Sequence, residues 1–202
     1  KPEVAIGEFY FNSESENIVE SKSLKLYLNS LNQERYKSAE AVRSIIEQDL
    51  SAISRSEVKV MLHALDEIEV DSLGGRAGRS IDNLDVEIDS HQPDAQLLEL
   101  GTEDVDDEVL YSDLFRSNCP VTGQPDWASV ELRYTGKKID ESSLLKYLIS
   151  FREHQGYHEE CAERIFRDIM LRCQPTELRV GMNFVRRGGL DINVYRATTP
   201  VT

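Results

Sequence analysis

The sequence contains one pattern of residues twice, at a constant separation of 120 positions. Residues 24–31 read LKLYLNSL and residues 144–151 read LLKYLISF, so leucine, tyrosine, leucine and serine recur at equivalent places. At the same separation, EVKVML at 57–62 corresponds to ELRVGM at 177–182. Matches in two distant segments at one separation indicate a duplicated domain. We therefore expect two similar folding units, and 202 residues are enough for both.

Strands are predicted at the beginning and the end of each copy. In the first copy, an apolar run at 4–11, a polar turn and residues 18–20 are typical of a hairpin. In the second copy, residues 129–139 alternate between apolar and charged side chains, and we expect a hairpin that turns at Gly136. Alternating strands close the two copies at 58–62 and 178–184.

Two helices are predicted between these strands in each copy. The first helix of copy one carries Leu24, Tyr27 and Leu28 at helical spacing and begins at a cap position, Ser21. The second helix carries an apolar stripe, formed by Val42, Ile45, Ile46, Leu50 and Ile53 in one copy and by Cys161, Ile165, Ile169 and Cys173 in the other. An antiparallel sheet with two helices on one face would bury these side chains, so the predicted fold class is α+β.

The residues between the two copies are strongly acidic. Seven carboxylates lie from Asp94 to Glu108, and a charge run of this kind is usually solvated. We therefore interpret the stretch as a linker. The predicted organisation is a first module at 1–90, an acidic linker at 91–110 and a second module at 111–202.

Charge and composition exclude several classes of function. The net charge of −14 argues against a nucleic-acid surface, because binding to phosphate backbones needs clustered lysine and arginine. No apolar run approaches the ~20 residues that cross a bilayer as a helix. The three cysteines include no CxxC pair, which fits a reducing compartment better than a disulfide framework.

A cysteine and an aspartate lie close together in SNCPVTGQPDWA, residues 117–128. The segment is rich in proline, glycine and threonine, so we expect a loop. Cys161 and Cys173 belong to the apolar stripe of a helix and are interpreted as buried packing residues. Cys119 belongs to no periodic face and is a candidate nucleophile, with an incidental thiol as the alternative. Asp126 is either its partner or a turn residue.

The segment GYHEEC begins the second helix of copy two and carries two further candidates. His158 shares the buried face of this helix, and Glu159 lies in its first turn. The helix N-terminus stabilises a negative charge there, so Glu159 is either a binding carboxylate or an ordinary residue of a first turn. A metal site built from Cys119, Cys161 and His158 has no supporting ligand spacing, so no metal is predicted.

Two short segments could hold an anion in this acidic chain. VESKSLKLY begins a helix with Ser21 and Lys22, and free amides, hydroxyls and a lysine at a helix start suit a phosphate. VRRGGLD places Arg187 and Gly188 in a turn where a ligand could approach the backbone. Each signal is weak alone, because helix caps and Arg-Gly turns are common.

Taken together, these motifs resemble one family, the NADPH-dependent nitrile reductases that act on 7-cyano-7-deazaguanine, the QueF family. Residues 20–27, ESKSLKLY, match the family's cofactor signature at all eight positions. SNCPVTGQPDWA is similar to its nucleophile segment, HEEC to its substrate motif and RRGGLDIN to its C-terminal motif. The resemblance covers the chain and indicates the long, two-module branch. It implies tandem tunnelling-fold (T-fold) domains and a further segment before Lys1.

The resemblance also implies a role for each candidate residue. Cys119 would add to the nitrile carbon and form a covalent thioimidate, while Asp126 would donate a proton. Substrate binding is implied for Val19, Glu20, Ser21, His158 and Glu159. Contacts with NADPH are implied for Ser21, Lys22, Arg187 and Gly188. Reduction of a nitrile to an amine takes four electrons, so two NADPH are expected to react in turn.

The family further implies a cytoplasmic homodimer that makes the queuosine precursor for tRNA, without direct contact with nucleic acid or membrane. Two alternatives remain open. Another tunnelling-fold purine or pterin enzyme, such as a cyclohydrolase-like hydrolase, would need a metal site. A non-enzymatic dimeric binding module would leave Cys119 incidental. Oxidation of NADPH that depends on added nitrile would distinguish the reductase from both.

Overall fold

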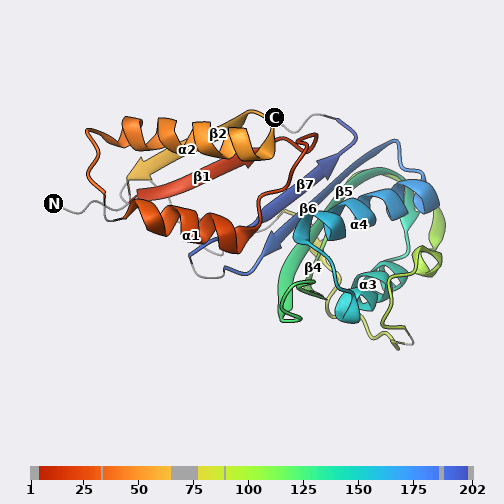
Figure 1. The fold of residues 1–202 in the computed structure, drawn as a ribbon. Helices are drawn as coiled ribbons and strands as arrows, with labels where there is room; N and C mark the ends of the chain where they lie inside the picture. Colours follow the sequence, from red (N-terminus) through yellow and green to blue (C-terminus); the bar gives the residue numbers. More distant parts are fainter. Residues whose placement is uncertain (1–4, 33, 65–76, 89, 187–188, 200–202) are drawn as a thin grey trace. The chain divides into compact units, whose positions relative to one another are not determined.

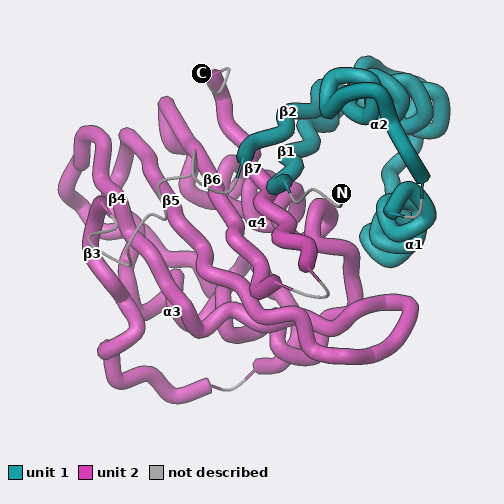
Figure 2. Tube along the Cα trace, turned by 90° about the vertical axis from the view of Figure 1, so that its left-hand side faces the viewer, with its two compact units in different colours: residues 1–74 teal, residues 75–202 magenta. Residues whose placement is uncertain are grey.

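The computed structural model describes residues 5–32, 34–64, 77–88, 90–186 and 189–199. The chain divides into two compact units, residues 1–74 and residues 75–202, which Figure 2 colours separately. Both units combine helices with antiparallel strands, so the predicted α+β class is confirmed. No helix among the described residues is long and apolar enough to cross a membrane.

Unit 1 is a two-stranded antiparallel sheet with two helices. Its elements are β1 (Ala5–Phe11), α1 (Ser21–Leu31), α2 (Ala39–Ser54) and β2 (Val58–Ala64). The buried core comes from Ile46 and Leu50 of α2 and from Val58 and Val60 of β2, and apolar residues of α1 pack against it. Both helices therefore cover the same face of the strand pair (Figure 1).

Two predictions for unit 1 are wrong in detail. Residues 18–20 are not a strand, because β1 pairs along its whole length with β2, from Ala5 opposite Ala64 to Phe11 opposite Val58. The N-cap of α1 is Glu20 rather than Ser21. Short apolar runs cannot reveal that the partner of a strand lies two helices further along the chain.

Unit 2 is a five-stranded sheet with two long helices on one face (Figure 1). Its elements are β3 (Arg79–Ser80), η1 (Ala95–Leu97), β4 (Leu100–Asn118), β5 (Pro125–Ile139), α3 (Glu141–Ile149), η2 (Ser150–Glu153), α4 (His158–Cys173), β6 (Glu177–Phe184) and β7 (Asn193–Ala197). The strands follow the order β3-β4-β5-β6-β7, antiparallel except for β3 beside β4. The predicted order of two strands, two helices and two strands is thus present from β4 to β7.

The hairpin of unit 2 differs from the predicted one. β5 runs without a break through residues 129–139, and its hairpin partner is β4. Gly136 is needed for close packing instead of a turn, since a Cβ there would lie 3.0 Å from Pro175 Cα and its φ is +155°. The loop predicted at 117–128 shortens to residues 119–124, because the strands extend into both of its ends.

The acidic stretch from Leu100 to residue 110 is the first half of β4 and not a linker. Its carboxylates face a basic strand, since Asp104 pairs with Lys137 at 2.9 Å and Asp107 pairs with Arg133. Opposite charges across the two strands stabilise the sheet, because the neighbouring carboxylates of β4 would otherwise repel one another. The linker prediction at 91–110 is therefore wrong for 100–110, and the described residues from 77 onward already belong to unit 2.

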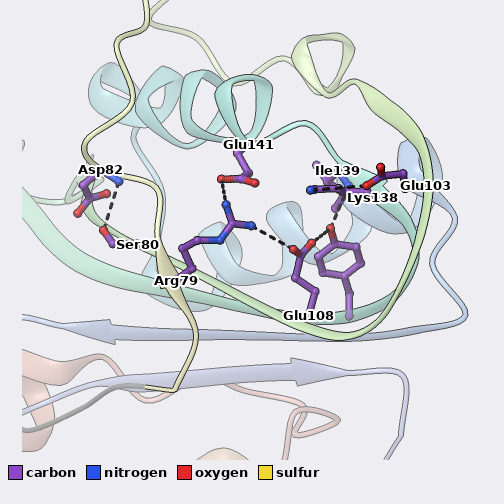
Figure 3. Close-up of polar contacts among 9 residues, drawn as sticks. Arg79, Ser80, Asp82, Glu103, Glu108, Lys138, Ile139 and Glu141 are labelled. Carbon is purple, nitrogen blue, oxygen red and sulfur yellow. Dashed lines mark hydrogen bonds and ion pairs between the residues drawn. The ribbon is translucent and has the colours of Figure 1, made fainter.

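Arg79 lies between β4 and α3, as Figure 3 shows. Its guanidinium bonds to Glu108 of β4 and to Glu141 of α3. The other oxygen of the Glu108 carboxylate accepts a hydrogen bond from the Tyr134 hydroxyl, which itself accepts one from the Ile139 amide. One cation thus joins β3, β4 and α3.

The helix pair of unit 1 and the helix pair of unit 2 contain the same internal hydrogen bonds. The Tyr27 hydroxyl of α1 donates to Asp49 of α2 at 2.7 Å, and the Tyr147 hydroxyl of α3 donates to Asp168 of α4 at 2.8 Å. The hydroxyls of Ser30 and Ser150 donate to the carbonyls of these two tyrosines, both at 2.6 Å. The same bonds at equivalent places agree with the duplication predicted from the sequence.

Candidate active site

The thiol of Cys119 lies at the tip of the β4–β5 hairpin. Its backbone amide donates to the Gln124 carbonyl and its carbonyl accepts from the Gly123 amide, both at 2.8 Å. Gly123 has φ +66°, a conformation that favours glycine and lets the six-residue connection turn. The hairpin therefore holds the thiol at a fixed place while leaving it half-buried.

The surroundings of Cys119 favour its thiolate. Burial raises the pKa of the thiol, but hydrogen bonds from the Thr122 hydroxyl and from the Thr122 and Val121 amides outweigh burial, so the pKa is lowered. The charge of Asp126 acts in the opposite direction and is near enough to do so. A thiol with a lowered pKa has the electronic character of a nucleophile.

The other two cysteines behave as predicted packing residues. Cys161 and Cys173 are buried on the sheet-facing side of α4, and burial raises the pKa of each to about 11. Both thiols stay protonated at neutral pH, which leaves Cys119 as the thiol suited to nucleophilic chemistry.

Thr122 provides a direct test of this environment. The Thr122→Val variant keeps the side-chain shape and removes the hydroxyl that favours the thiolate, so the pKa of Cys119 rises. We expect the pH profile of Cys119 alkylation by iodoacetamide, followed by mass spectrometry, to move to higher pH. The rate at neutral pH should fall several-fold. Thr135→Val, on β5 away from the loop, serves as the control, and an unmoved profile in Thr122→Val would contradict the assignment.

Asp126 lies on the helix-covered face of β5, in alternation with Ala128 and Val130, and is only 6% exposed. His158, the first residue of α4, places Nε2 3.4 Å from Asp126 Oδ2. The imidazole stacks on the ring of Phe184 from β6, with centroids 3.8 Å apart and planes 16° apart. The alternative interpretation of Asp126 as a turn residue is therefore wrong, and its carboxylate is a buried neighbour of an imidazole.

The segment before α4 is fixed to the hairpin tip through Asn118. The Asn118 amide donates to the His154 carbonyl at 2.8 Å, and its carbonyl accepts from the Gly156 amide at 3.2 Å. These two bonds make a short parallel bridge with Gln155. The residue before the thiol is thus bound to the segment that leads into His158.

Glu159 occupies the first turn of α4 but does not cap it. The capping carboxylate is Glu160, which accepts from the Tyr157 amide at 2.8 Å. Within the part of unit 2 that the structure describes, the half-buried Glu159 side chain has no hydrogen-bond or ion-pair partner. Its carboxylate therefore remains able to bind a ligand.

The predicted anion site at the start of α1 is partly filled by the chain itself. Glu20 accepts hydrogen bonds from the amides of Lys22 and Ser23, both at 2.9 Å, and from the Ser23 hydroxyl at 3.0 Å. Partial burial raises the pKa of Glu20, but these bonds outweigh burial and the pKa is lowered. The amides of Lys22 and Ser23 are therefore not free for a phosphate, and the exposed Lys22 side chain is a basic group beside them.

The remaining predicted residues lie in different parts of the chain. Val19 packs against the core of unit 1, and Ser21 is the first residue of α1. Arg187 and Gly188 lie outside the described residues. Their neighbour Arg186 pairs with Asp191 at 2.6 Å. Among the described residues, no group of His, Cys, Asp or Glu could hold a metal ion.

Three contributors to this site have no clear signal in the sequence. Val121 and Thr122 act through a backbone amide and a hydroxyl in the loop, and Phe184 acts through its ring. Thr122 could have been suspected from its place in the hairpin turn. Phe184 ends an alternating strand and looks like any core residue until β6 is placed beside α4.

Comparisons with known proteins agree on one family. The family described as "Nitrile reductase, 7-cyano-7-deazaguanine-reductase N-term" matches residues 1–62, and "QueF-like protein" matches residues 125–201. A protein of Desulfotalea psychrophila named "NADPH-dependent 7-cyano-7-deazaguanine reductase" is 52% identical over 200 residues, which is 98% of this chain and 72% of the relative. A protein of the same name from Burkholderia multivorans is 50% identical over 200 residues, or 97% and 72%.

Among solved structures, an archaeosine synthase, QueF-Like, in its apo form aligns with a TM-score of 0.43 and 17% identity. The alignment covers 50% of this chain and 100% of that one, a likeness too distant to carry an argument.

Proposed function

The chain belongs to the family of NADPH-dependent 7-cyano-7-deazaguanine reductases, and from this premise we propose that it reduces the nitrile of 7-cyano-7-deazaguanine to 7-aminomethyl-7-deazaguanine through a bond to Cys119. The observation that carries the proposal is the hairpin-tip thiol with a lowered pKa, near enough to the buried carboxylate of Asp126 to feel its charge. Two pieces of the expected chemistry, a nucleophile and a proton source, thus lie together in unit 2.

The proposed first step joins the Cys119 sulfur to the nitrile carbon. One carbon–nitrogen π bond breaks as the carbon–sulfur bond forms, and the nitrogen takes a proton to give a neutral thioimidate. Without that proton the addition would leave a charge on nitrogen and reverse easily. Asp126 is the proposed donor: its buried carboxylate, held by His158, takes the proton of the Cys119 thiol as the thiolate forms and passes it to the nitrile nitrogen.

NADPH, when bound, supplies the hydride for each of the two reductions. The overall balance is one nitrile, two NADPH and two protons to one amine and two NADP⁺. For the chain's own residues, this balance requires that Cys119 be released as a thiolate after the first reduction. The hydrogen bonds that lower its pKa also make it a better leaving group.

The direct test of this function is an absorbance assay of NADPH with purified protein and 7-cyano-7-deazaguanine. We expect oxidation only in the presence of the nitrile, with two NADPH consumed for each nitrile converted. Oxidation without the nitrile, or no oxidation while Cys119 remains alkylatable, would contradict the proposal. This result also separates a reductase from a hydrolase or a binding module.

Substrate recognition is proposed for His158 and Glu159 of unit 2 and, from the family resemblance, for Val19, Glu20 and Ser21 of unit 1. The ring of the substrate has a guanine-like donor edge, and Glu159 is a carboxylate without an internal partner in the described part of unit 2. Charge-assisted hydrogen bonds between such groups contribute about 1.5–3 kcal/mol each.

Glu159→Ala is therefore expected to weaken nitrile binding by about tenfold or more, with NADPH affinity nearly unchanged. Isothermal titration of each ligand measures the two affinities separately. Glu163→Ala is the matched control, since Glu163 lies on the same helix and pairs with Arg196 on the surface. Unchanged nitrile affinity in Glu159→Ala would show that Glu159 is an ordinary residue of a first turn and does not bind the substrate.

NADPH binding is proposed to involve Ser21, Lys22, Arg187 and Gly188. The chain carries a net charge of −14, so the phosphates of the cofactor need local basic groups. Lys22 is exposed at the start of α1 and fits this requirement, although the neighbouring amides are bonded to Glu20.

Lys22→Ala should lower NADPH affinity by roughly tenfold, because hydrogen bonds to charged groups contribute about 1.5–3 kcal/mol. Fluorescence titration with NADPH gives the affinity, and the covalent nitrile adduct, which needs no cofactor, should form as in the wild type. Lys59→Ala on β2 is the control within the same unit. Normal NADPH binding by Lys22→Ala would place the cofactor elsewhere.

We further propose tandem T-fold modules, assembly as a cytoplasmic homodimer, and a role in queuosine biosynthesis without direct contact with tRNA. The shared helix-pair contacts of the two units support the duplication. Analytical ultracentrifugation tests the dimer, and a mass of one chain at micromolar concentration would contradict it.

A further inference from the structure

Three segments of unit 2 carry the candidate site, and Arg152 of η2 contacts two of them and lies just before the third. The end of β4 precedes Cys119, the start of β5 holds Asp126, and the segment after η2 leads into His158. These segments are far apart in the sequence, so contacts between them decide whether the three side chains meet.

Arg152 reaches the two strands through its side chain. Its Nη2 donates to the Leu114 carbonyl in β4 at 3.3 Å, within the register shift between Ser112 and Phe115. Its guanidinium carbon lies 5.5 Å from the ring centroid of Trp127, the neighbour of Asp126 in β5. A guanidinium stacks on an indole through its flat face, which a lysine ammonium does not offer.

The backbone of Arg152 completes the connection. Its carbonyl accepts from the Asn118 side-chain amide at 3.2 Å, and the other end of that amide accepts from Arg116 at 3.1 Å. Arg116 itself lies over the same indole, 5.8 Å from the centroid. Asn118 directly precedes the thiol, so this chain of contacts ends one residue from Cys119.

The charge of Arg152 is not used in an ion pair within the described residues of unit 2. Arg79, Arg133 and Arg196 of the same unit, by contrast, have carboxylate partners. Arg152 is held by a carbonyl and a ring, which fix the direction of its side chain. Contacts that fix the direction of a side chain are suited to holding neighbouring segments in one arrangement.

We propose that Arg152 is a positioning residue that aligns Cys119, Asp126 and the start of α4 for addition of the thiol to the nitrile. The inference rests on the proposed function, since it concerns the same reaction. Loss of the guanidinium stack would let the 152–156 segment shift against the hairpin. A misplacement of ~1 Å between reacting groups costs about 10²-fold in rate.

Two reactions of one thiol separate positioning from general stability. Alkylation by iodoacetamide needs only the thiolate, and the groups that favour the thiolate lie within the loop itself, at Val121 and Thr122. Addition to the bound nitrile needs the thiol, the proton donor and the substrate in alignment. A positioning residue should therefore affect the second reaction and spare the first.

The experiment compares Arg152→Lys with wild type and with Arg179→Gln, a control whose guanidinium stacks on Tyr195 of β7 in the same sheet. The rate of adduct formation with 7-cyano-7-deazaguanine, without NADPH, is followed by mass, and the alkylation rate is followed from pH 6 to 9. We expect adduct formation to fall by about 10²-fold in Arg152→Lys. Its alkylation profile and the control should match wild type.

Trp127 gives an independent arm, so that the test does not depend on one variant folding. Trp127→Phe keeps an aromatic face and should retain most of the rate of adduct formation, while Trp127→Leu should lose it as Arg152→Lys does. Adduct formation at the wild-type rate in Arg152→Lys, or an equal loss of alkylation and addition, would overturn the positioning role. A wild-type chain that is alkylated at Cys119 but forms no adduct would overturn the proposed function itself.

Discussion

In the Cys119→Ala variant, incubation with 7-cyano-7-deazaguanine gives no covalent adduct, and NADPH oxidation falls by roughly 10⁴-fold or more, the scale seen when a catalytic nucleophile is removed. The wild-type mass increases by one substrate under the same conditions. The physical reason is that Cys119 has a lowered pKa, while burial raises the pKa of Cys161 and Cys173 to about 11. Intact-mass spectrometry and the NADPH assay measure the two effects.

Cys173→Ala is the control for this experiment, because Cys173 lies in the last turn of α4 and should leave the adduct unchanged. A circular dichroism spectrum equal to wild type confirms that Cys119→Ala is folded. Peptide mapping then locates the wild-type adduct. An adduct on Cys161 or Cys173, or one that persists in Cys119→Ala, would refute the assignment of the nucleophile.

Asp126→Asn is expected to retain nitrile binding and to lose the group that delivers the proton. Asparagine has the shape of aspartate, so nitrile affinity should stay within a few-fold, whereas turnover should fall by about 10²–10⁴-fold, the usual contribution of a general acid. The same substitution should make Cys119 more reactive toward alkylation. The Asp126 charge raises the pKa of Cys119, so its removal lowers that pKa and the alkylation profile moves to lower pH.

This combination separates Asp126 from a purely structural carboxylate. A faster alkylation at acidic pH together with a slower turnover means that the thiolate is more available while proton delivery is lost. Asp113→Asn on β4 is the control, since its carboxylate accepts from Ser129 on the exposed side of the sheet. Unchanged turnover in Asp126→Asn would show that another group supplies the proton.

The helices and most strands could be predicted from the sequence because their signals are local. The apolar stripe from Ile46 to Leu50 and the alternation from Val130 to Tyr134 follow directly from helical and strand periods. The pairing of strands depends on residues that are far apart in the sequence, and the predicted strand pairings were wrong. β1 pairs with β2, which follows it only after two helices, and Asp104 and Asp107 pair with basic residues of a strand about thirty residues later.

In the candidate site, too, some residues could be predicted from the sequence and others could not. Cys119 and Asp126 could be identified from residue type and position, and the family resemblance gave them roles. The amides and hydroxyl that favour the thiolate, the ring of Phe184 under His158, and the contacts of Arg152 depend on how β4, β5 and η2 meet. Such contacts involve residue types that are common everywhere, so no short pattern marks them.

The pairing of β4 with β5 determines which face each side chain of the hairpin occupies. Asp126 opposes Ser117 and points to the helices, while Trp127 points the other way. A shift of one residue would exchange them, because strand side chains alternate. The Asp104–Lys137 and Asp107–Arg133 pairs lie at the far end of the same two strands. These surface charges match the observed alignment of the hairpin, in which a carboxylate and not an indole lies on the helix-covered face near the thiol.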